Sequence, residues 1–421
     1  MSEQTSSHIR KGTIFVHPRG FGFVSSEGSD DIFIPKESTA NAMDGDTVEA
    51  EVTSRSAKGL EGVVLSIIKR GREEVVGTVC RLFDKTALVV CPMLGPGKTL
   101  EIKKPKKISV GERIVMQLND RASGEHGPPC SFKYSLGSID DASRDIACSL
   151  IEYGLKSTFT DEQLEAAAAF GETIPEGPHP GREDLRHLDC FTIDPASARD
   201  FDDALSIETK GDLVELGVHI ADVAHYIKPQ SPLDLEAKIR CNSTYFPGQC
   251  VPMLPEALSN GLCSLRPQVD RMTMSVFMVF DANGELKNHR IVRGIIHSKR
   301  RFTYEEAKEI LDGKASDHFE KEIQAMHALA SKLRQARRER GSVEFAAKEA
   351  VINIDTGGMP TGITYVEHDI SHQLVEEFMI KANAVVAGHL TEKQKRTIYR
   401  IHEEPDEGSR EDFVRMANLL G

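Results

Sequence analysis

The sequence lacks several features that would direct its interpretation toward other classes of protein. No two of its eight cysteines are spaced as Cys-x-x-Cys, so zinc and dithiol redox motifs are unsupported. No apolar run approaches the length of about 18 residues that a membrane-spanning helix needs. The first residues also lack the basic and apolar regions of a secretory leader. These absences predict a soluble, cytoplasmic protein without a membrane partner.

Positive charge is scarce in the chain as a whole. The net charge of -13 at pH 7 argues mildly against nucleic acid, because phosphate binding relies on lysine and arginine. Basic residues nevertheless cluster locally. The clusters are Lys103, Lys104, Lys106 and Lys107; Lys299, Arg300 and Arg301; and Arg337, Arg338 and Arg340. Each cluster taken alone is interpreted first as a solvated face and only second as a phosphate-binding surface.

Acidic residues, by contrast, are concentrated in the stretch from residue 191 to residue 204. The aspartates there are Asp194, Asp200, Asp202 and Asp203. Strand-forming residues flank them on both sides, so we expect a loop between two strands. Carboxylates held this close share protons or bind cations, and magnesium takes oxygen ligands from aspartate. The alternative is an ordinary solvated loop whose acids serve as caps and turn formers.

The same stretch resembles a known family. Thr192-Ile193-Asp194 and the run from Ala198 to Ala204 are similar to the signature of the ribonuclease II and ribonuclease R exoribonucleases, and closest to bacterial ribonuclease R. Further motifs of that family follow in order. They are Tyr245-Phe246-Pro247, Val251 to Pro255, Leu258-Ser259 and Leu262 to Leu265. The resemblance therefore extends over most of the chain.

The resemblance implies an exoribonuclease that degrades single-stranded RNA from the 3′ end and releases nucleoside 5′-monophosphates. Two metal ions can screen the anionic phosphodiester, generate the nucleophile and stabilise the leaving oxygen. By resemblance, the catalytic residues that also bind two magnesium ions are Asp194, Asp200, Asp202 and Asp203. We expect Asp202 to activate or position water. The residues do not show which aspartate binds which ion.

The resemblance also implies residues that contact RNA. Tyr245 and Phe345 match residues that stack on the terminal bases, and Glu376 matches a glutamate that lines the RNA channel. Helical periodicity alone does not choose between Glu376 and Glu377. Each of the three predicted contacts could equally be a core or surface residue by itself. The expected partner is single-stranded RNA, bound by a monomer.

Short strand-like runs separated by turn residues fill the first part of the chain. Five such runs between residues 9 and 70 predict a small closed barrel. Phe21 and Phe23 share one face of their strand, and Phe33 can join them to form a platform for unpaired bases. The alternative is that the rings are core. The run from Arg19 to Val24, followed by Asp31 to Ile34, resembles the RNA-binding strands of a cold-shock domain, which favours the platform.

The remainder of the chain divides into three segments. Residues 75–119 are β-rich and resemble, by position, the family's second cold-shock-like domain, and residues 120–134 are interpreted as a linker. Residues 135–421 are expected to form the catalytic domain. The predicted fold class is therefore an α+β catalytic domain preceded by two small OB-type (cold-shock-like) β-barrels.

Within the catalytic domain the apolar pattern predicts two pairs of strands and two long helices. The strand pairs are expected at residues 204–209 with 213–223, and at 271–280 with 289–296. One helix is predicted from Phe319 to Arg340, stopped by Gly341, and another is predicted to begin at Ser371.

The sequence also departs from the family. The family's Ser-Pro-x-Arg-x-Tyr tract, with the arginine that clamps the scissile phosphate, and its C-terminal OB-type domain do not occur in the 421 residues. We therefore expect a catalytic domain that is incomplete at its C-terminus. A second hypothesis stays open on this ground, namely a truncated RNA-binding protein that does not hydrolyse RNA.

Overall fold

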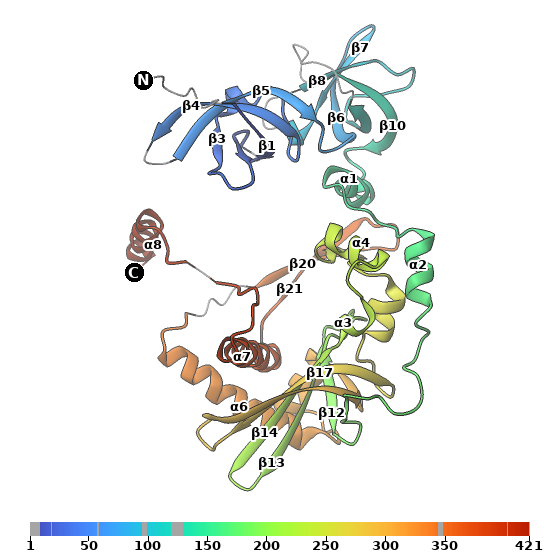
Figure 1. The fold of residues 1–421 in the computed structure, drawn as a ribbon. Coiled ribbons are helices and arrows are strands. Elements are labelled where there is room, and N and C mark those ends of the chain that lie inside the picture. Colours follow the sequence, from blue (N-terminus) through green and yellow to red (C-terminus); the bar gives the residue numbers. More distant parts are fainter. Residues whose placement is uncertain are drawn as a thin grey trace. The chain divides into compact units, whose positions relative to one another are not determined.

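The computed structural model groups the chain into two compact units (Figure 1). The first unit comprises Met1–Asp161, Glu236–Met253 and Glu349–Val366, and the second comprises Glu162–Leu235, Leu254–Lys348 and Glu367–Gly421. The residues that the structure describes are 9–17, 19–56, 59–94, 99–118, 129–343, 348–401 and 403–420. Within these ranges, no helix combines the length and the apolar character needed to span a membrane.

The first unit begins with a closed barrel of five strands. In chain order they are β1 (Ile9–Val16), β2 (Gly22–Ser25), β3 (Ile32–Ile34), β4 (Thr47–Ser56) and β5 (Gly59–Lys69), with the short helix η1 (Lys36–Ser38) after β3. They pair in the order β1-β2-β3-β5-β4. Ile14 of β1, Val24 of β2 and Ile34 of β3 lie in the barrel core. Successive side chains of a strand point to opposite faces, so every second residue of each strand can be buried. The predicted barrel is confirmed.

A second sheet of five strands follows in the first unit. Its strands are β6 (Glu74–Leu82), β7 (Thr86–Val90), β8 (Thr99–Lys103), β9 (Glu112–Leu118) and β10 (Cys130–Ser138), with η2 (Pro92–Leu94) between β7 and β8. They pair in the order β10-β9-β6-β7-β8, and the end strands β8 and β10 also contact each other. Val79, Val89 and Ile114 lie in its buried core.

The linker expected at residues 120–134 overlaps this sheet. Cys130 to Tyr134 pair with Leu118 to Val115 of β9, so the strand begins inside the expected linker. The glycines and prolines that suggested a linker all precede Cys130, whereas the residues after it can alternate across a strand. Residues 120–128 lie outside the described residues.

Shorter elements complete the first unit. They are η3 (Ala142–Arg144), α1 (Asp145–Glu152), and the two hairpins β15 (Thr244–Phe246) with β16 (Gln249–Val251) and β20 (Glu349–Ile354) with β21 (Pro360–Val366). The sequence analysis did not predict the hairpin formed by β20 and β21.

The second unit is built on a sheet of seven strands in the order β11-β18-β17-β14-β13-β12-β19. Their bounds are β11 (Glu183–Asp184), β12 (Cys190–Asp194), β13 (Asp203–Lys210), β14 (Leu213–Ala221), β17 (Asp270–Phe280), β18 (Leu286–His297) and β19 (Arg300–Thr303). β12 runs antiparallel to β13 and parallel to β19. The four strands predicted here are present, with ends shifted by at most about three residues, an ordinary boundary error.

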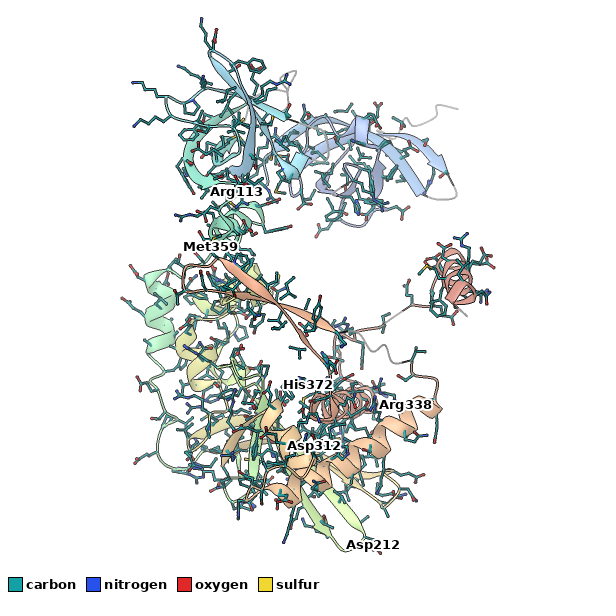
Figure 2. All side chains as sticks on the ribbon, turned by 180° about the vertical axis from the view of Figure 1, so that it is seen from behind. Arg113, Asp212, Asp312, Arg338, Met359 and His372 are labelled. Carbon is teal, nitrogen blue, oxygen red and sulfur yellow. The ribbon has the colours of Figure 1, made fainter. Side chains whose placement is uncertain are left out.

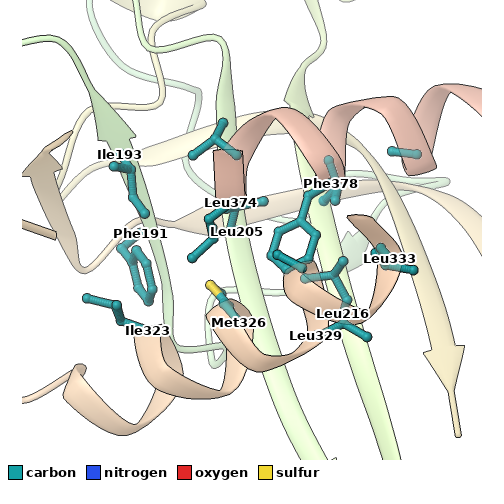
Figure 3. Packing of buried hydrophobic residues seen from close by; sticks show 14 of the residues in the cluster. Phe191, Ile193, Leu205, Leu216, Ile323, Met326, Leu329, Leu333, Leu374 and Phe378 are labelled. Atoms are coloured by element: carbon teal, nitrogen blue, oxygen red, sulfur yellow. The ribbon is translucent and has the colours of Figure 1, made fainter. Parts of the chain in front are cut away.

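The helices in this part of the chain are α2 (Asp161–Ala168), α3 (Val223–Tyr226), α4 (Pro232–Arg240), the π-helix η4 (Ala257–Leu262), α5 (Tyr304–Leu311), α6 (Glu320–Glu339), α7 (Ile370–Glu392) and α8 (Glu407–Leu420). Of these, α5, α6 and α7 contact strands of the sheet. The side chains of α8 are exposed wherever the structure describes them. The main core joins Phe191, Leu205 and Leu216 of the strands to Met326 of α6 and Phe378 of α7 (Figure 3).

The two predicted long helices are present as α6 and α7. Gly341, just after α6, has φ of +98°, a left-handed conformation that glycine adopts without strain. α7 begins one residue before the predicted Ser371, and the Asp369 carboxylate caps it by accepting from the main-chain N–H groups of Ser371 and His372.

The structure distinguishes the two adjacent glutamates of α7. Glu377 is buried, and its Oε1 accepts hydrogen bonds from Nε and Nη2 of Arg337 in α6, at 3.0 and 2.6 Å. Glu376 is exposed. Arg337, which the sequence analysis interpreted first as part of a solvated basic face, therefore joins two helices.

We expect Glu377→Ala to lower the free energy of unfolding by about 2 to 3 kcal/mol, because it leaves a largely buried guanidinium without its carboxylate. Glu376→Ala is the matched control and should change it by less than about 0.5 kcal/mol. Thermal unfolding of the two variants measures the difference. A Glu377→Ala variant as stable as the control would show that the ion pair contributes little.

Candidate active site

The four aspartates lie at the junction of β12 and β13. Asp194 is the last residue of β12 and Asp203 the first of β13, while Asp200 and Asp202 stand in the loop between them. The predicted loop between two strands is therefore present. Because β12 and β13 are neighbours in the sheet, their ends bring both halves of the motif to one edge.

Main-chain hydrogen bonds hold this loop in place. The N–H of Phe201 donates to the Ser264 hydroxyl at 3.1 Å, and the carbonyl of Phe201 accepts from the N–H of Leu265 at 2.8 Å. The carbonyl of Asp202 accepts from the N–H of Ala221 at 3.0 Å. The side chain of Phe201 is buried in the second core cluster of this unit. The loop therefore has a defined course, and its carboxylates are carried by a fixed backbone.

The carboxyl groups influence one another. Burial raises the pKa of Asp194 to about 6, and the nearby Asp200 and Asp202 add to this shift. Burial, with contributions from Asp194 and Asp202, raises the pKa of Asp203 to about 7. Asp202 is open to solvent on one side, yet partial desolvation and then Asp200 raise its pKa as well. Like charges shift one another in this way only when they are close.

This carboxylate set is suited to magnesium. Oδ2 of Asp194 is buried and has no hydrogen-bond partner, and such an oxygen is costly unless a cation or proton satisfies it. In the ranges that the structure describes, no three or more His, Cys, Asp or Glu side chains are grouped closely enough to hold one ion. Magnesium is commonly bound through one or two carboxylates, with waters and substrate phosphates as its other ligands. Pairs of these aspartates fit that pattern.

Arg301 of β19 offsets part of the negative charge. Its Nη2 donates to the carbonyl of Pro195 at 2.6 Å, and its guanidinium lies 5.5 Å from the centre of the Phe201 ring. It lowers the pKa of Asp194, against the larger effect of burial. The sequence analysis interpreted Arg301 as part of a solvated face and expected magnesium to compensate the acids. The parallel pairing of β12 with β19 brings Arg301 to the loop.

Tyr304 also lies near the aspartates, and His372 packs against Tyr304; the sequence analysis singled out neither residue. Burial, followed by Asp203 and Asp194, raises the pKa of Tyr304 to about 12. Its ring stacks on His372 with 3.9 Å between ring centres. His372, labelled in Figure 2, is hydrogen-bonded through Nδ1 to Asp369 at 2.9 Å. Neither residue stands in a motif that marks it in the sequence.

In the first unit, the three predicted phenylalanines form one cluster. Phe23 stands opposite Phe33 in the pairing of β2 with β3, with 5.6 Å between ring centres. Phe21 lies 5.9 Å from Phe23 and 5.8 Å from Phe33. All three rings are only partly buried, and they point away from the barrel core. The core interpretation of these rings is therefore wrong.

Two further rings join this aromatic face. His17 stacks on Phe21 with 4.4 Å between ring centres. Phe15 is opposite Phe23 in the pairing of β1 with β2 and is 54% exposed. Sequence reasoning missed Phe15, although its alternation with buried Ile14 could have identified it as outward-facing.

The other three predicted RNA contacts stand in different places. Tyr245 lies in β15 of the first unit and is 68% exposed. Glu376 lies on the exposed side of α7 in the second unit. Phe345 lies outside the described residues. The roles of all three stay predictions.

Comparison with family models matches both parts of this fold. A model described as the RNB domain matches residues 182–420, which include the aspartate loop, β19 and α7. A model described as the Ribonuclease B OB domain matches residues 12–67, which lie within the closed barrel.

Comparison with individual proteins points to the same family as the two family models. Ribonuclease R of Chlamydia pneumoniae is 38% identical over 425 residues, which cover 97% of this chain and 63% of that protein. Ribonuclease R of Acidithiobacillus ferrooxidans is 36% identical over 354 residues, which cover 80% of this chain and 79% of that protein. The solved structure of Mycoplasma genitalium RNase R with ribose-methylated single-stranded RNA has a TM-score of 0.83 at 26% identity, covering 98% of this chain and 66% of that one.

Length sets these relatives apart from the chain. The chain spans about three fifths of the length of the curated relatives first matched. The similarity nevertheless runs through nearly all of its own residues, including both the barrel and the aspartate loop. The chain belongs to the ribonuclease R family of RNB-domain proteins.

Proposed function

We propose that this chain hydrolyses single-stranded RNA from the 3′ end, using two magnesium ions, and releases nucleoside 5′-monophosphates. The observation that carries the proposal is the group of carboxylates at the junction of β12 and β13, in which the pKa values of Asp194, Asp202 and Asp203 are raised and Oδ2 of Asp194 is buried without a hydrogen-bond partner. Membership of the ribonuclease R family supports the reaction class. The RNA-bound structure of the Mycoplasma relative supports the substrate class.

We assign different tasks to the residues of the site. Asp194 and Asp203 are the most shielded carboxylates, so they suit cation binding in a partly desolvated position. Asp202 is the most open to solvent among these three, and we assign it the positioning of the attacking water. Bound magnesium would supply charge screening and activation of that water. Arg301 adds a fixed positive charge at the edge of the loop.

The aromatic face of the first barrel is proposed to bind the RNA at unpaired bases. Stacking of a base on an aromatic ring contributes about 1 to 3 kcal/mol and accepts any base, as an enzyme without sequence preference requires. Phe21, Phe23 and Phe33 provide the centre of this face, and Phe15 and His17 extend it. Tyr245, Phe345 and Glu376 are proposed to contact the 3′-terminal nucleotides, on the strength of the family resemblance.

The test is release of mononucleotides from single-stranded RNA by the purified 421-residue chain, with and without magnesium. We expect nucleoside 5′-monophosphates as products and no products when a chelator removes the metal. RNA binding is measured in parallel under the chelator. Binding without any product in magnesium would contradict the hydrolytic proposal and favour the second hypothesis, a non-hydrolytic RNA-binding protein.

A further inference from the structure

Ser264 stands in the stretch Leu262 to Leu265, which resembles the family in sequence but has no task in the proposed reaction. It is 63 residues from Phe201 along the chain, yet its side chain lies against the loop that carries Asp200 and Asp202. Ser264 is fully buried. A buried hydroxyl is nearly always hydrogen-bonded, so its partners show which part of the structure it supports.

The Ser264 hydroxyl bridges the two main-chain groups that flank Asp200. It donates to the carbonyl of Arg199 at 2.8 Å and accepts from the N–H of Phe201 at 3.1 Å. A serine hydroxyl has one hydrogen to donate and two lone pairs to accept with, so both bonds form at the same time. The main chain on each side of Asp200 is therefore tied to one oxygen atom.

The position of Asp200 depends on such contacts more than the positions of the strand aspartates do. Asp194 is paired in the ladder of β12 with β19, and Asp203 is paired in the ladder of β13 with β14. Asp200 stands in the loop between β12 and β13, outside both ladders. Its main chain is held instead by the side chain of Ser264.

Ser264 is itself fixed by three further hydrogen bonds. Its N–H donates to the carbonyl of Gly261 at 3.2 Å, and its carbonyl accepts from the N–H of Arg266 at 2.8 Å. The same carbonyl accepts from Nε of Arg271 at 2.9 Å, and Arg271 is a residue of β17 that is only 2% exposed. The hydroxyl is thereby anchored to the central sheet as well as to the loop that it supports.

We propose that Ser264 is a positioning residue of the aspartate site, whose hydroxyl holds the Asp200 carboxylate where it can bind a metal ion. The inference rests on the proposed function, because it gives Ser264 a task in metal binding. Magnesium requires near-ideal octahedral geometry with its oxygen ligands at about 2.0 to 2.1 Å, so a small displacement of one carboxylate weakens its binding.

Ser264→Ala removes the hydroxyl and leaves the two main-chain groups beside Asp200 without their partner. Buried polar groups that lack a partner are costly, so we expect the loop to shift until water or another group satisfies them. The Asp200 carboxylate moves with its main chain. Replacement of a residue that orients a metal ligand commonly lowers metal affinity or activity by about 10- to 100-fold.

The test compares Ser264→Ala with Ser275→Ala, its matched control. Ser275 of β17 is also buried, and its hydroxyl is hydrogen-bonded to the side chains of His219 and Thr273. Both substitutions therefore remove a buried hydroxyl that has two partners. Those of Ser264 belong to the main chain of the aspartate loop, whereas those of Ser275 are side chains of the sheet.

Metal binding is measured without RNA, by the electron paramagnetic resonance signal of free manganese(II), an ion that takes oxygen ligands as magnesium does. Binding at the aspartate site is the part that Asp194→Asn removes. Mononucleotide release is measured over a range of magnesium concentrations. Thermal unfolding without metal is recorded for each variant, so that a loss of metal affinity can be compared with a loss of stability.

We expect Ser264→Ala to bind manganese(II) about 10- to 100-fold more weakly than the unchanged chain, and to need correspondingly more magnesium for half-maximal RNA hydrolysis. Ser275→Ala should match the unchanged chain in both measurements. Ser264→Cys keeps the size of the side chain, and its thiol is a weak donor and acceptor, so its affinity should lie between those of serine and alanine. If Ser264→Ala does not fold, Ser264→Cys takes its place, with an affinity below that of Ser275→Ala.

Three results would overturn the inference. The first is unchanged manganese(II) affinity in Ser264→Ala. The second is an equal loss of affinity in Ser264→Ala and Ser275→Ala, which would show that stability alone is responsible. The third is an unchanged chain that binds no manganese(II) at the aspartate site. Weaker binding by Ser264→Ala in a chain that releases no mononucleotides would support the positioning role and contradict the proposed hydrolysis, so the two proposals fail separately.

Discussion

Asp202→Asn is expected to lower the rate of RNA hydrolysis by about 10³-fold or more while RNA affinity changes little. The substitution keeps the size of the side chain but removes the charge of the carboxylate that we assign to the attacking water. In the proposed function, RNA binding depends on the aromatic face of the first barrel, to which Asp202 does not belong. Mononucleotide release and RNA affinity, measured on the same preparation, check both parts of this prediction.

Asp212→Asn is the matched control for this experiment. Asp212, labelled in Figure 2, lies in the exposed turn between β13 and β14, at the opposite end of β13 from Asp203. Its substitution makes the same change of charge and should leave the rate unchanged. Turnover by Asp202→Asn at the rate of this control would remove Asp202 from the mechanism.

Replacing Phe21, Phe23 and Phe33 together by alanine is expected to weaken binding of single-stranded RNA by about 3 kcal/mol, or more than 100-fold. The three rings form one cluster on the outer face of the barrel, so each can contact a base. The barrel core consists of other residues, including Ile14 and Val24, and should keep the variant folded. Anisotropy with labelled RNA and thermal unfolding test the two statements.

Tyr134→Ala combined with Tyr153→Ala is a suitable control, because both residues are exposed aromatic side chains of the same unit. This variant should bind RNA as the unchanged chain does. A triple phenylalanine variant that unfolds would mean that the rings support the barrel. A folded triple variant with unchanged RNA affinity would show that the aromatic face does not bind RNA.

The parts of the fold that could be predicted from the sequence are those set by local patterns. Alternation identified the strands β13, β14, β17 and β18, and helical spacing identified α6 and α7, because burial of one face imposes those periods. The four aspartates were found for a similar reason, since all of them lie within one short stretch. Phe21, Phe23 and Phe33 were found because neighbouring strands carry them.

The parts that the sequence could not show depend on contacts between distant residues. Arg301 and Tyr304 reach the aspartates because β19 pairs with β12 in parallel, about a hundred residues away in the chain, and nothing in either strand specifies that partner. Helical spacing did not show which of Glu376 and Glu377 is buried, because burial of Glu377 depends on its ion pair with Arg337 of another helix.

The most direct test of the central claim is the order of degradation from the two ends of one RNA. Single-stranded RNA labelled at its 3′-terminal nucleotide, and the same RNA labelled at its 5′ end, are incubated with the chain and magnesium. If the aspartate site degrades RNA from the 3′ end, the 3′ label appears at once as a mononucleotide, while the 5′ label stays on progressively shorter RNA. Immediate release of the 5′ label as a mononucleotide, or internal fragments from both substrates, would contradict the account.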